Sequence, residues 1–498
     1  MQLQFAKQGI SCLHTIKREV QSQEQTQEFR IPDGMPDIGS IIGAWGQVIL
    51  RSKEWQSDAM TVTGGTMVWI QYLPEEGGVP QCVESWLPFQ MRWSLPQTQH
   101  DGTIFNQPLL CGVDARSLSA RKMMIRSNVS VLAWAMEQRQ TDLYQPVDLP
   151  EDVQLLTKTY PMELPVEAGE KNFELEEDFS LPPSAPKMET LLQYSLQPEI
   201  TEEKLMVDKV VFRGNAQLHV CYLADDGGQY AWDFDLPFTQ YNELEGEYGE
   251  DAQVLLWPCV TALEMEKEEG ELHMKAGLLC QYRISNRPLI QVVEDAHSPR
   301  RSVNPTVQEL SLPGILEWQN QIIHIQQSSP MDGLRLTDVQ FLPQGVQVHS
   351  VPGEATVEMR GQFHVLSYDM EGNLRTENPK WEHTLTVPMG EGASMDATVW
   401  HHGKSQGNLM SGASQLTADV NLMTETVCSA PIPMVTALEL GELETPDPKR
   451  PSLIVRRADG QSLWELAKKN GSTVSSIQQA SQLQTEPEDA QMLLIPVM

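Results

Sequence analysis

One phrase in this chain occurs twice, and the distance between its copies constrains the fold more than any other feature. FRIPDGMPDIGSII, residues 29–42, returns as FSLPPSAPKMETLL, residues 179–192, with an offset of 150 residues. Both copies keep the Phe, two Pro and a closing aliphatic pair, whereas the acidic residues are replaced. Solenoid and propeller repeats are usually about 20–50 residues long. A period of 150 residues therefore indicates tandem domains.

A second motif follows the phrase and predicts what each domain is made of. It is VTGGTMVWIQY at residues 62–72, FRGNAQLHVCY at 212–222 and MRGQFHVLSY at 359–368, each with one matching glycine (Gly64, Gly214 and Gly361). Apolar residues at every second position, bounded by Gly and acidic turns, are typical of half-buried strands. The motif predicts three β-rich, sandwich-like units.

The phrase has a third, more divergent copy, LSLPGILEWQNQII, at residues 310–323. Its interval to Gly361 is longer than the interval in the other two copies. We therefore expect about sixteen extra residues between Ile323 and Gly361, because surface loops tolerate added length.

The fold class that follows is mainly β, with a small βααβ module at the end. The expected units are listed here in chain order: β unit 1 at residues 1–150, β unit 2 at 151–303, β unit 3 at 304–445, a Pro-rich linker at 446–452, and the module at 453–498.

The charge of the chain excludes some classes of partner. The formal net charge is −33, and nearly all of it lies before residue 451. Such a field repels phosphate backbones and anionic lipids, so nucleic acid and membrane surfaces are poor candidates. No apolar run is long enough for a signal peptide or a membrane span, so we expect the chain to remain in a cytosol.

No group of residues predicts catalysis, a cofactor or a metal. Asp33 and Asp37 resemble a carboxylate pair, but the second copy of the phrase has Pro183 and Lys187 there, so the phrase is interpreted as a structural corner. The His401–His402 pair is expected in a solvated, Gly-flanked loop. The seven cysteines show no C-x-x-C spacing and are expected to be buried thiols in a reducing compartment. The chain is predicted not to be an enzyme.

The tail, residues 453–498, is predicted to form a strand, two helices and a second strand. Ser462 is a suitable N-cap for a helix that buries Leu463, Leu466 and Ala467, and Gly471 is a suitable stop. A second helix and the strand MLLIPV follow.

Two parts of the chain resemble known families. PDGMPDIGSII, VTGGTMVWIQY, the EEGG turn and SWLPF resemble the SPOCS domain of spore-coat-associated proteins, and GQSLWELAKKNG with LLIP resembles a LysM module. SPOCS units that end in one LysM module resemble the clostridial spore-coat morphogenetic proteins that bind the coat-scaffold ATPase SpoIVA.

The resemblance implies a non-catalytic adaptor in the mother-cell cytoplasm, at the forespore surface and in the spore coat. Its LysM module would dock on the SpoIVA-like ATPase while the β units hold other coat proteins and help to encase the spore. The alternative is a wall or cortex protein that binds peptidoglycan or other N-acetylglucosamine glycans, because LysM modules generally bind such glycans.

The residues expected to bind the partner are Gln461, Ser462, Trp464, Lys468 and Ser481. Gln461, Ser481 and Ala490 depart from the residues common in glycan-binding LysM grooves, which favours a protein partner. Trp464 lies off the buried stripe of its helix. It is either a binding anchor or a staple onto the loop at residues 484–491.

Overall fold

The computed structural model is mainly β, with two short helices near the C-terminus among the residues that it describes. Those residues are 2–56, 58–96, 102–268, 271–330, 333–390, 392–410, 413–428, 431–445, 450–489 and 491–498. None of the helices within these ranges is long and apolar enough to cross a membrane. The predicted mainly β fold class is confirmed.

The first of three β-sandwiches uses six strands. They are β2 (Phe5–Arg30), β3 (Ile38–Gln56), β4 (Ala59–Pro74), β5 (Gln81–Ser94), β6 (Thr103–Ser119) and β7 (Lys122–Pro146). These strands form two antiparallel sheets, β2-β7-β6 and β3-β4-β5. In β5 every second residue from Val83 to Trp93 is buried, so the alternation in the sequence directs one face of the strand into the core.

The second sandwich repeats this strand order. Its strands are β9 (Leu164–Phe179), β10 (Met188–Leu205), β11 (Lys209–Ala224), β12 (Gln229–Glu243), β13 (Gln253–Glu268) and β14 (Glu271–Asn286). Its sheets are β13-β14-β9 and β10-β11-β12. Gly64 and Gly214 therefore lie in separate sheets that have the same topology.

The third sandwich has the same plan with its last edge strand divided. Its strands are β17 (Ile315–Pro330), β18 (Gly333–Val351), β19 (Glu354–Asp369), β20 (Leu374–Glu377), β21 (Lys380–Pro388), β22 (Ala393–Met410) and β23 (Ala413–Cys428). One sheet is β17-β23-β22, and in the other β19 pairs with β18, β20 and β21.

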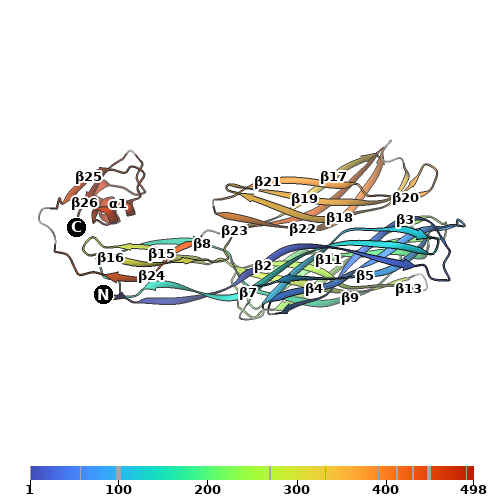
Figure 1. Ribbon diagram of the computed structural model, residues 1–498, viewed down its shortest axis with the longest axis horizontal. Coiled ribbons are helices and arrows are strands. Elements are labelled where there is room, and N and C mark those ends of the chain that lie inside the picture. The colour runs from blue at the N-terminus through green and yellow to red at the C-terminus, as the bar shows by residue number, and fades with distance from the viewer. Residues whose placement is uncertain are drawn as a thin grey trace.

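Strands that link the sandwiches form a separate part of the molecule, here called the connector layer. They are β1 (Gln2–Leu3), β8 (Gln154–Pro161), β15 (Leu289–His297), β16 (Val303–Leu310) and β24 (Ile432–Leu440). β8 pairs with β15, and β24 lies between β1 and β16. Figure 1 shows this layer at the end of the molecule where the N-terminus lies. The expected unit boundaries at 150 and 303 adjoin it, and they stay a prediction.

The C-terminal module comprises β25 (Leu453–Arg457), α1 (Leu463–Asn470), α2 (Val474–Ser481) and β26 (Met492–Pro496). β25 and β26 are antiparallel. Leu463, Leu466 and Ala467 pack against Ile477 and Leu493. This is the strand and helix order expected for residues 453–498, and the module lies beside the connector layer (Figure 1).

The repeated phrase carries the chain from one sheet of a sandwich to the other. In the first copy the Met35 N–H donates to the Pro32 carbonyl at 3.0 Å, and in the second copy the Ala185 N–H donates to the Pro182 carbonyl at 2.9 Å. The same turn closes in both copies although their polar residues differ. The phrase is a structural corner because proline restricts its own φ and the residue before it.

The carboxylates of the corner have structural partners. The Arg121 guanidinium donates to the carbonyls of Met35 and Pro32 at 2.6 and 2.7 Å and pairs with Asp37 at 2.9 Å. Asp33 is exposed. Asp37 thus neutralises an arginine that holds the corner together.

The predicted third copy of the phrase, residues 310–323, does not occupy the corner position in the third sandwich. Residues 315–330 form β17, which takes the place of β2, and β18 begins at Gly333, so the chain passes between the two sheets after Pro330. From Pro330 to Gly361 the chain has 31 residues, close to the 32 from Pro32 to Gly64. The expected insertion between Ile323 and Gly361 is therefore wrong. The LSLPG segment, residues 310–314, begins at the last residue of connector strand β16 and resembles the corner only in the spacing of its apolar residues.

The three sandwiches meet in a cyclic arrangement. β13 packs on β3, β6 packs on β18, and β22 reaches β10 through a hydrogen-bonded pair of His402 and Glu199. β6, β13 and β22 hold equivalent places in their sheets, as do β3, β10 and β18. The same two surfaces therefore meet three times around an approximate threefold axis.

Candidate functional site

Helix α1 is fixed at both ends by residues of the tail. The Ser462 side chain accepts the N–H of Glu465 at 3.2 Å, while the Ser462 N–H donates to the Glu465 carboxylate at 2.9 Å. Gly471 ends the helix with a φ of 60°, a conformation that favours glycine. This is the capping expected from the sequence. Ser462 therefore uses its hydroxyl for the start of the helix.

Trp464 and Lys468 project away from the core of the module and contact β15 of the connector layer. The Trp464 indole N–H donates to Asp295 Oδ2 at 2.9 Å. The Lys468 ammonium donates to Asp295 Oδ1 at 2.8 Å and to Oδ2 at 2.7 Å. The ring of His297 meets the indole edge-on, with centroids 4.6 Å apart. Trp464 is only 8% exposed, and its indole contacts Asp295 and His297 of β15.

The Lys468 ammonium and the Asp295 carboxylate carry opposite charges in this contact. Burial raises the pKa of Asp295, but hydrogen bonds from Lys468 and Trp464 outweigh burial and hold the pKa below its usual value. Burial, together with the nearby Lys468 ammonium, lowers the pKa of His297. At neutral pH the face of α1 therefore meets one carboxylate and one uncharged ring.

The other predicted partner-binding residues have different roles. Ser481 donates its hydroxyl to the Leu494 carbonyl at 3.2 Å and accepts the Leu494 N–H at 2.9 Å, which ties α2 to β26. The Gln461 side-chain oxygen is buried without a hydrogen-bond partner among the described residues. Ala490 lies outside the described residues. Partner binding by these residues stays a prediction. Of the five predicted residues, Trp464 and Lys468 both contact Asp295.

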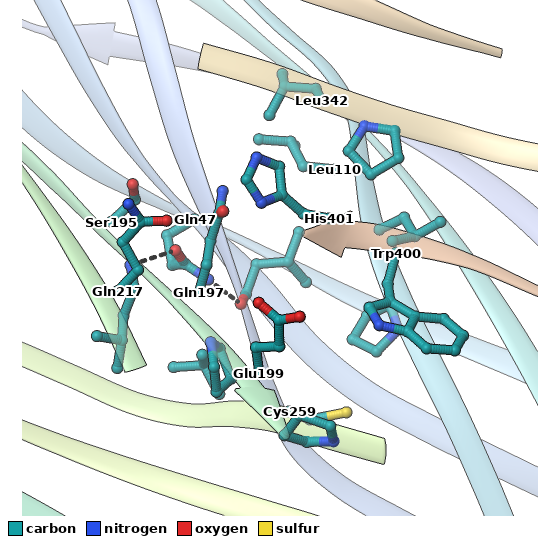
Figure 2. Close-up of a pocket in the computed structure, with 18 of the residues that line it drawn as sticks. Gln47, Leu110, Ser195, Gln197, Glu199, Gln217, Cys259, Leu342, Trp400 and His401 are labelled. Atoms are coloured by element: carbon teal, nitrogen blue, oxygen red, sulfur yellow. Dashed lines mark hydrogen bonds between the residues drawn. The ribbon is translucent and has the colours of Figure 1, made fainter. Parts of the chain in front are cut away.

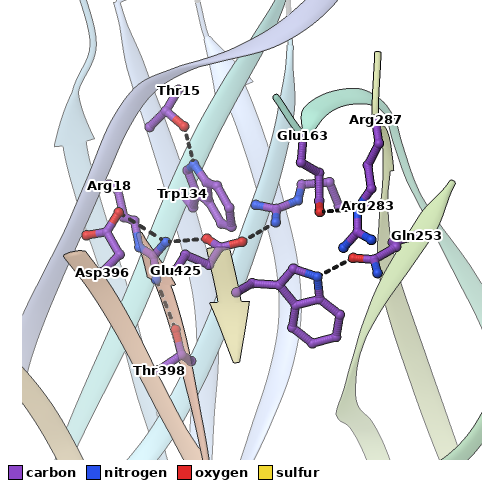
Figure 3. A network of polar contacts seen from close by, with 11 residues as sticks. Thr15, Arg18, Trp134, Glu163, Gln253, Arg283, Arg287, Asp396, Thr398 and Glu425 are labelled. Carbon is purple, nitrogen blue, oxygen red and sulfur yellow. Dashed lines mark hydrogen bonds and ion pairs between the residues drawn. The ribbon is translucent and has the colours of Figure 1, made fainter. Parts of the chain in front are cut away.

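A second candidate region lies where the three sandwiches meet. Trp134, Arg283 and Glu425 lie on the equivalent strands β7, β14 and β23, each eleven residues after the equivalent hairpin positions Met123, Leu272 and Ser414. Figure 3 shows these three side chains side by side. Arg283 lies over the Trp134 ring, 4.8 Å from its centroid, and pairs with Glu425. One position of the repeat therefore supplies an aromatic ring, a cation and an anion that complement one another.

Arg18 completes this junction from the first sandwich. Its guanidinium donates to Glu425 Oε2 at 3.2 Å and to Thr398 Oγ1 at 3.0 Å, and it lies 4.6 Å from the Trp134 ring centroid. Burial raises the pKa of Glu425, but Arg283 and Arg18 outweigh burial and keep the pKa below its usual value. One buried carboxylate therefore connects all three sandwiches (Figure 3).

A pocket of about 230 Å³ opens beside this junction, and the six strands that form the cyclic contact line it. Gln47, Gln197 and Gln340 occupy the same position in the three sandwiches, each paired with the residue three after the matching glycine. Apolar side chains such as Leu110 and Leu342 complete the wall (Figure 2).

Two titratable groups of the pocket wall, Cys259 and His401, have pKa values that burial shifts from their usual values. Burial raises the pKa of the Cys259 thiol to about 12, so this thiol stays protonated. Burial lowers the pKa of His401 to about 4, and its Nε2 lies 3.4 Å from Ser405, whose hydroxyl already accepts the Phe341 N–H. The lowered pKa makes His401 a weak base towards the Ser405 hydroxyl.

The structure corrects the prediction for the histidine pair. His401 and His402 lie inside β22, and not in a loop. His402 pairs with Glu199 of the second sandwich. Within the described ranges, no group of three or more His, Cys, Asp or Glu residues is arranged to hold a metal ion.

The sequence did not indicate the junction. Arg18, Arg283 and Glu425 are far apart in the chain and differ in type at the repeated position. Three Gln at equivalent strand positions were a visible signal, but their alignment depends on the corrected position of the third corner.

A family model matches part of the chain. Residues 187–266 match the model described as SipL, SPOCS domain. The match covers β10, β11 and β12 and continues into β13. The chain therefore contains a SPOCS domain, which marks a sporulation-related protein. No curated protein matches the chain.

Proposed function

We propose that this chain is a non-catalytic adaptor in spore-coat assembly. The observation that carries the proposal is the SPOCS match in the second sandwich, in a chain whose first and third sandwiches repeat the same strand order. In this proposal the sandwiches hold other coat proteins, and the C-terminal module docks on a SpoIVA-like coat-scaffold ATPase. The site of action is the forespore surface, on the mother-cell cytoplasmic side.

The C-terminal module supports the second half of the proposal. Its strand and helix order and its GQSLWELAKKNG sequence resemble a LysM module. Trp464 and Lys468 lie outside the core of the module and are available to a partner whenever β15 does not cover them. Ser481, at a groove position expected to bind glycan, is bonded to the backbone of Leu494, which favours a protein partner.

The test is titration of the full chain against the purified coat ATPase and, separately, against chitin oligomers. We expect binding to the ATPase and weak or no binding to the oligomers. Trp464→Ala should weaken ATPase binding by about 2 kcal/mol or more, roughly thirtyfold. Lys469→Ala, an exposed change on the same helix, is the matched control and should leave the affinity unchanged. Tight oligomer binding with no ATPase binding would refute the proposal and favour the wall or cortex alternative.

A further inference from the structure

We propose that the α1 face formed by Trp464 and Lys468 binds one ligand at a time, and that Asp295 and His297 of β15 are its internal ligand. In the closed chain this face is covered by β15. In the open chain it binds a partner strand that carries a carboxylate two residues before a flat ring. The second part rests on the proposed function of the module.

The first support is the small size of the contact. Among the described residues, the hydrogen bonds, ion pairs and ring contacts between α1 and the body are those of Trp464 and Lys468 with Asp295 and His297. The strands of the module pair with each other and not with the sheets of the body. A contact made by so few side chains separates without unfolding either part.

The second support is that Trp464 is not needed for the module to fold. Its indole is absent from the cluster of side chains that forms the core of the module. It is nevertheless only 8% exposed, and it contacts Asp295 and His297 of the connector layer. A large aromatic side chain on the outside of a small module is typical of a binding anchor, and here the anchor is occupied by the chain itself.

The third support is the specificity of the chemistry. The carboxylate of Asp295 accepts three hydrogen bonds from α1, one from the indole N–H and two from the ammonium, besides one from the Ala296 N–H. Two residues further along the strand, His297 presents an uncharged ring to the indole edge-on. An external strand competes with β15 if it offers the same two groups at the same spacing, because alternate residues of a strand lie on one face.

The internal ligand controls how tightly an external one binds. When only the open form is competent, the observed dissociation constant rises in inverse proportion to the open fraction. If one chain in ten is open, release of β15 should strengthen binding about tenfold.

The closed contact can be tested without any partner. The Trp464 indole N–H resonance of the full chain is assigned as the signal that Trp464→Phe removes. Asp295→Ala should shift this one signal and speed its exchange with solvent about tenfold or more. Lys468→Ala removes the other member of the ion pair and should have the same effect. Because this change lies on α1, agreement between the two variants shows that the effect does not come from local damage to β15. Glu294→Gln changes the neighbouring carboxylate, which pairs with Lys158 instead, and should leave the signal in place. An indole N–H that exchanges equally fast in the original chain and in Asp295→Ala would overturn the proposal.

The competition is then measured by titration against the coat ATPase. Asp295→Ala should bind about tenfold more tightly than the original chain. In that background Lys468→Arg should keep most of the affinity and Lys468→Glu should lose it, because the ligand offers a carboxylate. Unchanged affinity in Asp295→Ala, with the closed contact demonstrated by the indole signal, would overturn the competition. Absence of ATPase binding in every variant would refute the proposed function and the external half of this inference, while the indole signal would still support the closed contact.

Discussion

Replacing Glu425 by Gln should destabilise the junction of the three sandwiches by about 3–5 kcal/mol. Removal of one member of a buried ion pair typically costs this much, because the remaining charge is left uncompensated. Glu425 is 2% exposed and lies between Arg18 and Arg283, which are themselves 9% and 1% exposed in their side chains. Glutamine keeps the shape of the side chain, so the loss reports on the charge and on one acceptor oxygen that becomes an NH2 donor.

Two further variants separate charge from packing. The double variant Arg283→Met with Glu425→Leu removes both charges of the pair, while Arg18 keeps Asp396 at 3.3 Å. Such a replacement by apolar residues is often close to neutral, so the double variant should be more stable than Glu425→Gln. Glu382→Gln, an exposed position in the third sandwich, should change the stability by less than about 0.5 kcal/mol.

The assay is urea unfolding of the full chain at several pH values, followed by circular dichroism. The folded-state pKa of Glu425 is depressed, so its stabilisation is present above the unfolded pKa of about 4.3 and is lost as the pH falls through the folded pKa. The deficit of Glu425→Gln should therefore stay constant from about pH 5.5 to 8 and shrink below about pH 4. A deficit under about 1 kcal/mol at pH 7, or one that is unchanged at low pH, would refute the reasoning.

Three other predictions follow from packing and charge. Leu466→Ala should unfold the C-terminal module at a cost of about 2–5 kcal/mol, seen as loss of helical nuclear magnetic resonance signals while sheet signals persist. Burial alone would lower the pKa of His219, but Asp338 and Asp233 raise it to about 10. Stability should therefore fall as the pH rises from about 6.5 to 10, and His219→Gln should remove this slope in urea unfolding; an equal slope would contradict it. Gly64→Ala should destabilise the first sandwich by about 1–3 kcal/mol in the same assay, because its Cβ would lie 2.4 Å from a backbone oxygen; unchanged stability would be the contrary result.

The sequence predicted local structure well where one residue type decides the outcome. Ser462 and Gly471 cap α1 as expected, since an N-cap hydroxyl and a left-handed glycine act within one turn of helix. Alternation of apolar residues predicted the strands that carry Gly64 and Gly214. These signals depend only on near neighbours in the chain.

Long-range features were not predictable in the same way. Arg18 meets Glu425 across 407 residues, and no local pattern relates two such positions. The third corner was predicted too early in the chain, because Pro and aliphatic residues recur with similar spacing near the end of β16. Its position follows from the pairing of β18 with β19. The connector layer was missed because its strands pair with partners far away in the chain, β8 with β15 and both β16 and β1 with β24. Trp464 was expected either to be free or to contact its own module, and its contact with Asp295 requires the arrangement of the whole chain.

The order in which a ribosome delivers the junction residues affects how the chain folds. Arg283 leaves the ribosome 142 residues before Glu425, which is about 7–30 s at ordinary rates of translation. During that time the first two sandwiches hold guanidinium groups of Arg18 and Arg283 that have not yet met their shared carboxylate. Desolvating those cations early is costly, so the nascent sandwiches should remain apart. The last sandwich to be synthesised then locks the other two in place.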